Sequence, residues 1–426
     1  MSSPLEEAAP NPPAGKWRQP FDAMHPAQKF AVFCWVAVVG VILGRVAFSS
    51  QLPPSVVPVY ESAAHRWINS EDLYEYRYPW DVYRYPPCFA PSFVPFTHLP
   101  FRLGELLWRS LSIAVMLTGL WLWARHGLQL SPGQRGALFV LALPLCLNSL
   151  GNGQVNILLL GLLLHGAFAA LCLRGKAAGS FVALATAIKV YPIAVGLLLG
   201  CAYPKRIVVW LVLAIAFLAA FPFLLAPADY VAGQYRRFAE SVGADTRREV
   251  DHPYPPRDLY LVMRNYLVVP SDRNYEIIVL TVAAAMAGLV GFTAYKLQDS
   301  HSALILAFDL GCIWMTVFGP ATEPPTYALL APTAAACIIL NRQSPMRFAL
   351  AIISYLLLIA PVIRDFFPNG RPFHNLGIQP LGGLLLLGVL LLKWNSNRFL
   401  CASGRGRDMI KVCKPSLPSL PAIFRR

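Results

Sequence analysis

A lysine within a long apolar sequence is the first residue whose type points to chemistry. Lys189 lies in AIKVYPIAV, where a charged side chain is costly and needs a partner. A cation at that depth suits an anionic group such as a phosphate. Alternatively, the lysine extends to the membrane interface or pairs with an acid such as Asp309. We interpret Lys189 and the neighbouring Tyr191 as ligand-binding residues.

Three amide side chains stand directly before a leucine-rich run. Asn152, Gln154 and Asn156 occur together in GNGQVNILLLG. Amides are costly in hydrocarbon unless each donor and acceptor finds a partner. Two interpretations remain open: the amides cap the start of a helix, or they face the same cavity as Lys189 and bind a polyhydroxylated ligand.

Carboxylates that could take a proton lie in the first long polar segment. Asp81 directly follows an aromatic residue in YPWDVYRYPP. An acid held among aromatic rings is desolvated, which raises its pKa toward the range of a general base. We therefore predict Asp81 as the catalytic base, with Glu61 in YESAAHRW as the second candidate.

Further polar residues are candidates for substrate binding. Arg84 and Tyr85 follow Asp81 closely and would contact the same ligand. Glu323, in the polar interruption GPATEPPTY, could bind a sugar hydroxyl or only pair with a loop arginine.

The composition indicates which elements position these residues. Of 426 residues, 56% are hydrophobic and 14% are charged, whereas soluble domains carry about 25% charged residues. Mean hydropathy is +0.50. Apolar runs long enough to cross a membrane recur along the chain, which predicts an all-α polytopic membrane protein. The predicted crossings are Phe30–Phe48, Leu106–Trp123, Ala137–Leu150, Val155–Leu173, Ile207–Ala226, Ile277–Tyr295, Ala303–Phe318, Tyr327–Leu340, Phe348–Ile363 and Leu376–Leu392.

One apolar stretch, Gly179–Cys201, contains a helix breaker. Pro192 removes a backbone donor and clashes with the preceding turn. We predict two short helices in a re-entrant hairpin, with Lys189 at the turn. Irregular backbone at membrane depth is tolerated where it lines a cavity, so the hairpin predicts a cavity.

The predicted organisation is a single membrane domain, residues 30–393, with a polar leader (1–29) and a basic tail (394–426). Two long segments, about 49–105 and 227–276, form loops rich in acids and aromatic residues. Every lysine except Lys189 falls on the side of the leader and the tail, so the formal charge of +14 is a topology signal. It places both termini in the cytoplasm and the loops outside; a nucleic-acid partner is not expected.

Several reaction classes lack their sequence motifs. There is no P-loop and no G-x-S-x-G motif, and the nine cysteines show no CxxC spacing. Neither a metal nor any other cofactor is expected.

The motifs together resemble glycosyltransferase family 87. The resemblance is carried by GNGQVNILLLGLLL, by AIKVYP about thirty residues later with a basic pair beyond it, and by YESAAHRW, EDLY and YRYPP in the first loop. It extends from about Ser55 to Phe223. It implies a GT-C fold in the bacterial plasma membrane, a polyprenyl-phosphate sugar donor, typically of mannose, and a glycan or glycolipid acceptor.

One motif departs from the family pattern. The family usually places an acid a few residues before the loop tyrosine, but this chain reads VVPVY up to Tyr60. Either Asp81 or Glu61 takes over that role, or the activity differs or is lost. The alternatives are therefore a non-catalytic relative and a transporter or flippase of an anionic or lipid-linked substrate, since carriers also use broken helices. The long outer loops favour the enzyme.

Overall fold

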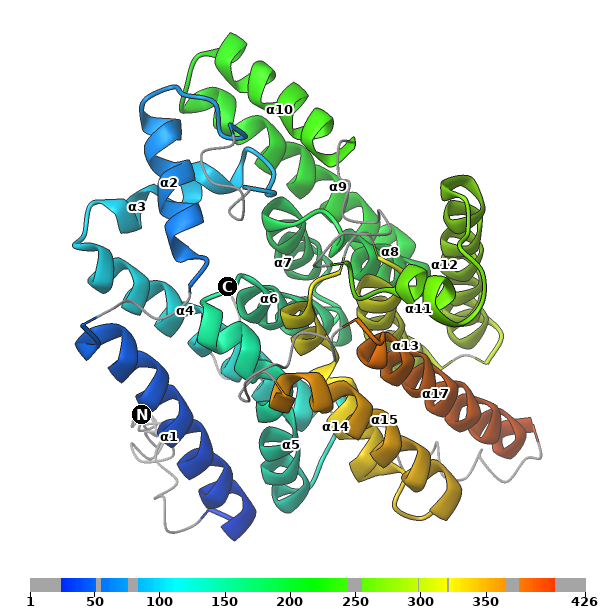
Figure 1. The fold of residues 1–426 in the computed structure, drawn as a ribbon. Helices are drawn as coiled ribbons and strands as arrows, with labels where there is room; N and C mark the ends of the chain where they lie inside the picture. Colours follow the sequence, from blue (N-terminus) through cyan, green and yellow to red (C-terminus); the bar gives the residue numbers. More distant parts are fainter. Residues whose placement is uncertain are drawn as a thin grey trace, which may run out of the picture.

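The protein folds as a bundle of helices, without strands in the described part of the chain (Figure 1). The computed structural model describes residues 24–50, 55–75, 83–243, 255–297, 299–319, 322–364 and 375–402. Within these ranges, seven helical segments are long and apolar enough to cross a membrane. They are α1 (Pro26–Phe48), α4 with η2 (Phe101–Gly127), α9 with η3 (Pro204–Leu224), α12 (Asp272–Tyr295), α13 with η4 (Ser300–Phe318), α15 (Pro345–Arg364) and most of α17 (Ile378–Ala402). The predicted all-α polytopic membrane protein is confirmed.

The remaining bundle helices are shorter or less apolar. The apolar ones are α6 (Asn156–Leu171), α7 (Gly175–Ile188), α8 (Ile193–Ala202) and η5 with α14 (Pro324–Leu340); α5 spans Pro132–Asn152. At a rise of about 1.5 Å per residue, the 14 residues of α7 span about 21 Å. The hydrocarbon layer is about 30 Å thick. The helix α7 and the 10-residue helix α8 are therefore each too short to reach from one membrane surface to the other.

The helix break predicted at Lys189 is present. The helix α7 ends at Ile188, Lys189 has extended backbone, and α8 begins at Ile193 after Pro192. Charged residues mark the other ends of these short helices: Arg174 and Lys176 at the start of α7, and Lys205 shortly after α8. If those ends lie at one membrane surface, the turn at Lys189 lies in a recess below the other surface.

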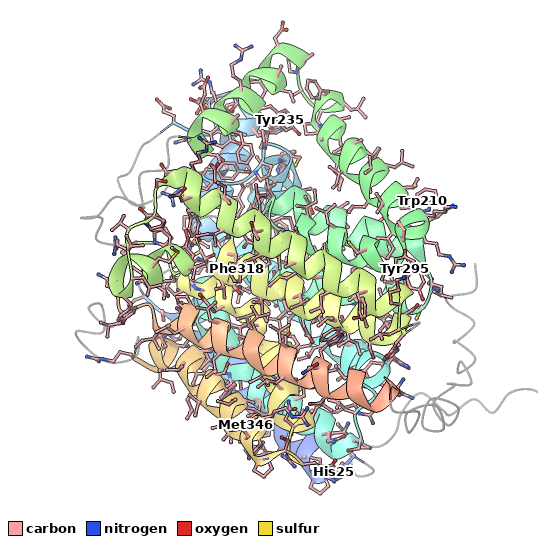
Figure 2. All side chains as sticks on the ribbon, turned by 90° about the vertical axis from the view of Figure 1, so that its right-hand side faces the viewer. His25, Trp210, Tyr235, Tyr295, Phe318 and Met346 are labelled. Carbon is pink, nitrogen blue, oxygen red and sulfur yellow. The ribbon has the colours of Figure 1, made fainter. Side chains whose placement is uncertain are left out.

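Four helices that do not span lie between the spanning ones: α2 (Val57–Ile68), α3 (Phe89–Thr97), α10 (Ala228–Gly243) and α11 (Leu259–Tyr266). We call the end of the bundle that carries α2, α3 and α10 the loop end. In Figure 2, Tyr235 of α10 lies at one end of the molecule, and His25 and Met346, which begin α1 and α15, lie at the other.

The two predicted outer loops pack on each other through α10. Gln234 accepts a hydrogen bond from the backbone N–H of Leu73 (3.0 Å), and the Tyr230 hydroxyl donates to the Glu71 carbonyl (2.8 Å). Arg237 forms an ion pair with Asp72. Segments far apart in the sequence thus form one polar layer over this end of the bundle.

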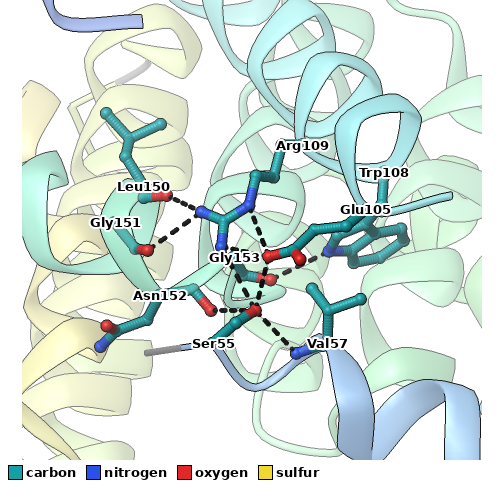
Figure 3. A network of polar contacts seen from close by, with 9 residues as sticks. All are labelled: Ser55, Val57, Glu105, Trp108, Arg109, Leu150, Gly151, Asn152 and Gly153. Carbon is teal, nitrogen blue, oxygen red and sulfur yellow. Dashed lines mark hydrogen bonds and ion pairs between the residues drawn. The ribbon is translucent and has the colours of Figure 1, made fainter. Parts of the chain in front are cut away.

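A buried ion pair ties the start of this layer to the bundle (Figure 3). Glu105 and Arg109, one turn apart on α4, are almost fully buried, with Nη2 of Arg109 2.5 Å from Oε1 of Glu105. Arg109 also donates to the carbonyls of Leu150 (2.5 Å) and Gly151 (3.0 Å), where α5 ends. Ser55, just before α2, donates to Glu105 at 2.7 Å. The pair therefore joins α4, the end of α5 and the start of α2.

The chain reverses at Gly153, directly beside this pair. Its φ is 66°, in the left-handed region that favours glycine. A Cβ atom there would lie 2.9 Å from Val57 and 3.1 Å from the Arg109 guanidinium. The indole of Trp108 donates to the Gly153 carbonyl at 2.9 Å. The break between α5 and α6 is thus held in position by α4.

We expect Arg109→Ala to destabilise the protein by about 3–5 kcal/mol, because it leaves the Glu105 carboxylate buried without its cation. The measurement is unfolding of the detergent-solubilised protein by heat and by denaturant.

The matched control is Arg237→Ala, since both side chains of its ion pair with Asp72 are partly exposed, at 53% and 22%. That change should cost about 1 kcal/mol or less. Equal destabilisation by the two substitutions would contradict the role given to the buried pair.

Candidate active site

The Lys189 side chain lies among the residues that the sequence singled out. Its ammonium donates to the Asn156 side-chain oxygen at 3.4 Å. It also lies 5.4 Å from the ring centroid of Tyr85 and 5.5 Å from that of Tyr191. These distances are within the range of a cation–π contact, about 6 Å. The structure therefore brings together four of the predicted binding residues from three separate segments.

Two amides continue this arrangement away from the lysine. The Tyr191 hydroxyl also donates to Oδ1 of Asn156 (3.1 Å), and Nδ2 of Asn156 donates to Oε1 of Gln154 (2.6 Å). Both amides are buried, Asn156 completely. No side chain caps the start of α6. The capping interpretation is therefore wrong for Gln154 and Asn156, whereas Asn152 bonds to Asn148 within α5 (2.8 Å).

A carboxylate stands at the other end of the amides. Nε2 of Gln154 donates to Oε2 of Glu323 at 3.4 Å, and Arg84 approaches Oε1 of Glu323 at 3.9 Å. The side chains of Arg84 and Glu323 are 38% and 41% exposed, so this end of the site is open. We call the residues Lys189, Asn156, Gln154 and Glu323 the polar array.

Aromatic side chains from the loop end form one wall beside the array. The hydroxyls of Tyr60 and Tyr85 lie 3.0 Å apart, and Tyr60 also accepts from the backbone N–H of Val155 (3.3 Å). The ring of Tyr60 packs edge-on against Phe89 and Trp108. Tyr60 was not predicted as a site residue. Its signal was its place in the YESAAHRW motif, which does not show that the tyrosine faces inward.

Glu61, next to Tyr60, faces elsewhere. It lines a surface hollow of about 440 Å³ together with His65 and Asn69. Burial raises the pKa of the Glu61 carboxyl; His65, 4.0 Å away, opposes this shift and Glu105 adds to it. Asp81 lies outside the described residues. Among the described residues, Glu61 is thus not in contact with Lys189, and the role of Asp81 stays a prediction.

Ligands for a metal do not gather in the described ranges. There, no group of three or more His, Cys, Asp or Glu side chains is arranged to hold an ion.

The apolar helices of the bundle define a multi-pass membrane protein, and the polar array is its candidate site. Residues 83–320 match glycosyltransferase family 87, more than half of the 426-residue chain. The protein belongs to this family and is a membrane glycosyltransferase, as its sequence motifs predict. No curated protein matches the chain. The matched region includes Arg84, the amides and Lys189, and it ends three residues before Glu323.

The raised pKa of Glu61 predicts a pH-dependent stability. A carboxyl with a higher pKa in the folded than in the unfolded state stabilises the fold while it is protonated. This contribution is complete below the unfolded pKa, near 4.5, and is lost as the pH rises through the folded value. We expect Glu61→Gln to raise the melting temperature at pH 7 and to leave it unchanged at pH 4.

Thermal unfolding at the two pH values measures this effect, with Glu240→Gln on the exposed face of α10 as the control. A lower melting temperature of Glu61→Gln at pH 7 would show that the charged form stabilises the fold.

Proposed function

We propose that the protein transfers a hexose from a polyprenyl-phosphate sugar to a glycan or glycolipid acceptor. Mannose is the sugar that the family resemblance suggests. The observation that carries the proposal is the place of Lys189: an ammonium at the turn of two short apolar helices, in contact with two buried amides through Asn156. Such a site suits a ligand that combines a lipid, an anion and a sugar.

Each part of this donor has a matching surface. Val190, next to Lys189, is 51% exposed, so the cation borders apolar surface that a prenyl chain can contact. The ammonium of Lys189 would face the phosphate, and the rings of Tyr85 and Tyr191 lie beside the ammonium. Asn156 and Gln154 can exchange their mutual hydrogen bonds for bonds to sugar hydroxyls. A neutral or soluble donor would not use this combination.

The reaction breaks the bond between the anomeric carbon and the phosphate oxygen. The acceptor hydroxyl attacks the anomeric carbon, its proton passes to a carboxylate, and the phosphate leaves with the bonding electrons. Negative charge grows on the departing phosphate, and a cation placed there in advance lowers the barrier. Lys189 has this role in the proposal. Asp81 and Glu61 remain the sequence-based predictions for the carboxylate.

The charge distribution supports an extracytoplasmic site. Cations lie near the helix ends opposite the loop end, where short loops join the spans: Lys29, Arg125, Arg135, Arg174, Lys176, Lys205, Arg206, Lys296, Arg342 and Arg347. Cytoplasmic loops carry such an excess. We therefore propose that the loop end faces outward from the plasma membrane and that both termini are cytoplasmic.

A transporter or flippase of a lipid-linked substrate is the second candidate, because the broken helices α7 and α8 also suit a carrier. The packed layer of α2, α3 and α10 favours the enzyme, since an acceptor needs a surface and a carrier needs an open path.

We expect Lys189→Met to lower sugar transfer from a polyprenyl-phosphate donor by about 100-fold, because the leaving phosphate loses its cation. The measurement is radiolabelled sugar transfer by purified protein in lipid vesicles, with a panel of polyprenyl-phosphate sugars.

Lys176→Met is the matched control. Both lysines contact aromatic rings, but Lys176 lies in the first turn of α7, at the other end of the helix from Lys189, and its ammonium is 4.6 Å from the ring centroid of Trp210. It should retain wild-type transfer. Equal losses in the two variants would refute the role of Lys189, and absence of transfer by the wild type with every donor would refute the proposed function.

A further inference from the structure

We propose that Glu323 is the carboxylate that takes the proton of the acceptor hydroxyl. The inference rests on the proposed function and names the base in its reaction. Glu323 is connected to Lys189 by three side-chain hydrogen bonds that run through Gln154 and Asn156, with lengths of 3.4, 2.6 and 3.4 Å. The carboxylate and the cation thus belong to one site, although they lie far apart in the sequence.

The ends of the array fix the orientation of the two amides between them. An ammonium group only donates hydrogen bonds, and a carboxylate only accepts them. Asn156 therefore turns its oxygen to Lys189 and its nitrogen to Gln154, and Gln154 turns its nitrogen to Glu323. Both amides point the same way, so donors face the carboxylate end and acceptors face the cation end. A neutral side chain at Glu323 would leave Lys189 as the one charged group that sets this orientation.

The segment that carries Glu323 is held rigidly. Pro324 and Pro325 restrict the backbone directly after it. The Pro325 carbonyl accepts from the Ser149 hydroxyl at 2.6 Å, and the Thr322 carbonyl accepts from the backbone N–H of Arg257 at 2.6 Å. These contacts hold the backbone on both sides of Glu323, while its carboxylate stays partly exposed. A proton acceptor needs such a fixed position and access for the acceptor hydroxyl.

Two ordinary structural roles explain this carboxylate poorly. Glu323 occupies the N-cap position of η5, but its side chain makes no capping hydrogen bond. Its contact with Arg84 is long, 3.9 Å, and both side chains are about two-fifths exposed. Exposed pairs of this kind contribute about 1 kcal/mol or less. These two roles therefore contribute little to the position of the Glu323 carboxylate.

The order of the residues in the array fits the geometry of the displacement. The attacking hydroxyl and the departing phosphate lie on opposite sides of the anomeric carbon. A base beside the hydroxyl and a cation beside the phosphate must therefore be separated by the sugar. Two amide side chains, which can bind sugar hydroxyls, separate Glu323 from Lys189. The acceptor would enter at the exposed end, next to Glu323 and Arg84.

The transfer needs no reactant besides the donor, the acceptor and the Glu323 carboxylate. The acceptor oxygen forms a bond to the anomeric carbon as the carbon–oxygen bond to phosphate breaks. The phosphate keeps that electron pair and remains as polyprenyl phosphate beside Lys189. The hydroxyl proton moves to the Glu323 carboxylate, which later releases it to solvent through its exposed side.

The experiment compares the variants Glu323→Gln, Glu323→Asp and Gln154→Leu, with Glu240→Gln as the matched acidic control, in the vesicle transfer assay. We expect Glu323→Gln to lower kcat by about 100-fold or more, the size of a general-base contribution, with KM for the donor nearly unchanged. Glu323→Asp should retain part of the rate, and Glu240→Gln all of it. Gln154→Leu should mainly raise KM for the donor.

Two results would overturn the assignment while leaving the proposed function in place. One is a Glu323→Gln variant that transfers sugar at the wild-type rate, together with loss of transfer in Asp81→Asn or Glu61→Gln. The other is an equal rise of donor KM in Glu323→Gln and Gln154→Leu with kcat unchanged, which would show that Glu323 only positions Gln154. Absence of transfer by the wild type would instead overturn the proposed function, and the base assignment with it.

Discussion

A cation in an apolar surrounding must be given polar partners, and much of the loop end is arranged around that requirement. Lys189 can lie at the turn between α7 and α8 because a helix break opposite it supplies Asn156, and because the loop end supplies the ring of Tyr85. Replacing these partners by apolar groups would leave the ammonium desolvated, at a cost of several kcal/mol. The ammonium is placed by the break between two short helices and is given polar partners by the amides and the aromatic wall.

The buried pair of Arg109 and Glu105 holds in position the chain break that carries the two amides. Arg109 binds the carbonyls at the end of α5, and Trp108 binds the Gly153 carbonyl, so α4 holds the break from which Gln154 and Asn156 project. Because Ser55 joins the same pair, the start of α2 is placed by the same contacts, and with it Tyr60. The polar layer at the loop end is thus joined to the membrane helices through a few buried polar bonds.

Family membership and the site geometry give different kinds of information. The family match spans residues 83–320, so it covers the lysine and the amides, whereas Glu61 lies before it and Glu323 after it. The resemblance directs attention to an acid in the first loop, where Asp81 and Glu61 are the available residues. The hydrogen bond from Gln154 points to Glu323 instead, a residue that lies more than 130 positions after Lys189 in the sequence. A contact across the fold can add a residue that a local motif does not include.

The sequence by itself determined the class of the fold, the helix break at Lys189 and the set of polar residues that belong together. These follow from local physics: apolar length sets the spans, proline interrupts a helix, and buried polar side chains need partners. Only the tertiary structure decided which partners they find. It placed Tyr60 against Val155 and Glu61 on a different face of α2, in the surface hollow with His65, and it brought Glu323 to Gln154. Successive side chains on a helix differ by about 100° in direction, and contacts between distant segments depend on packing, so spacing in the sequence could determine neither result.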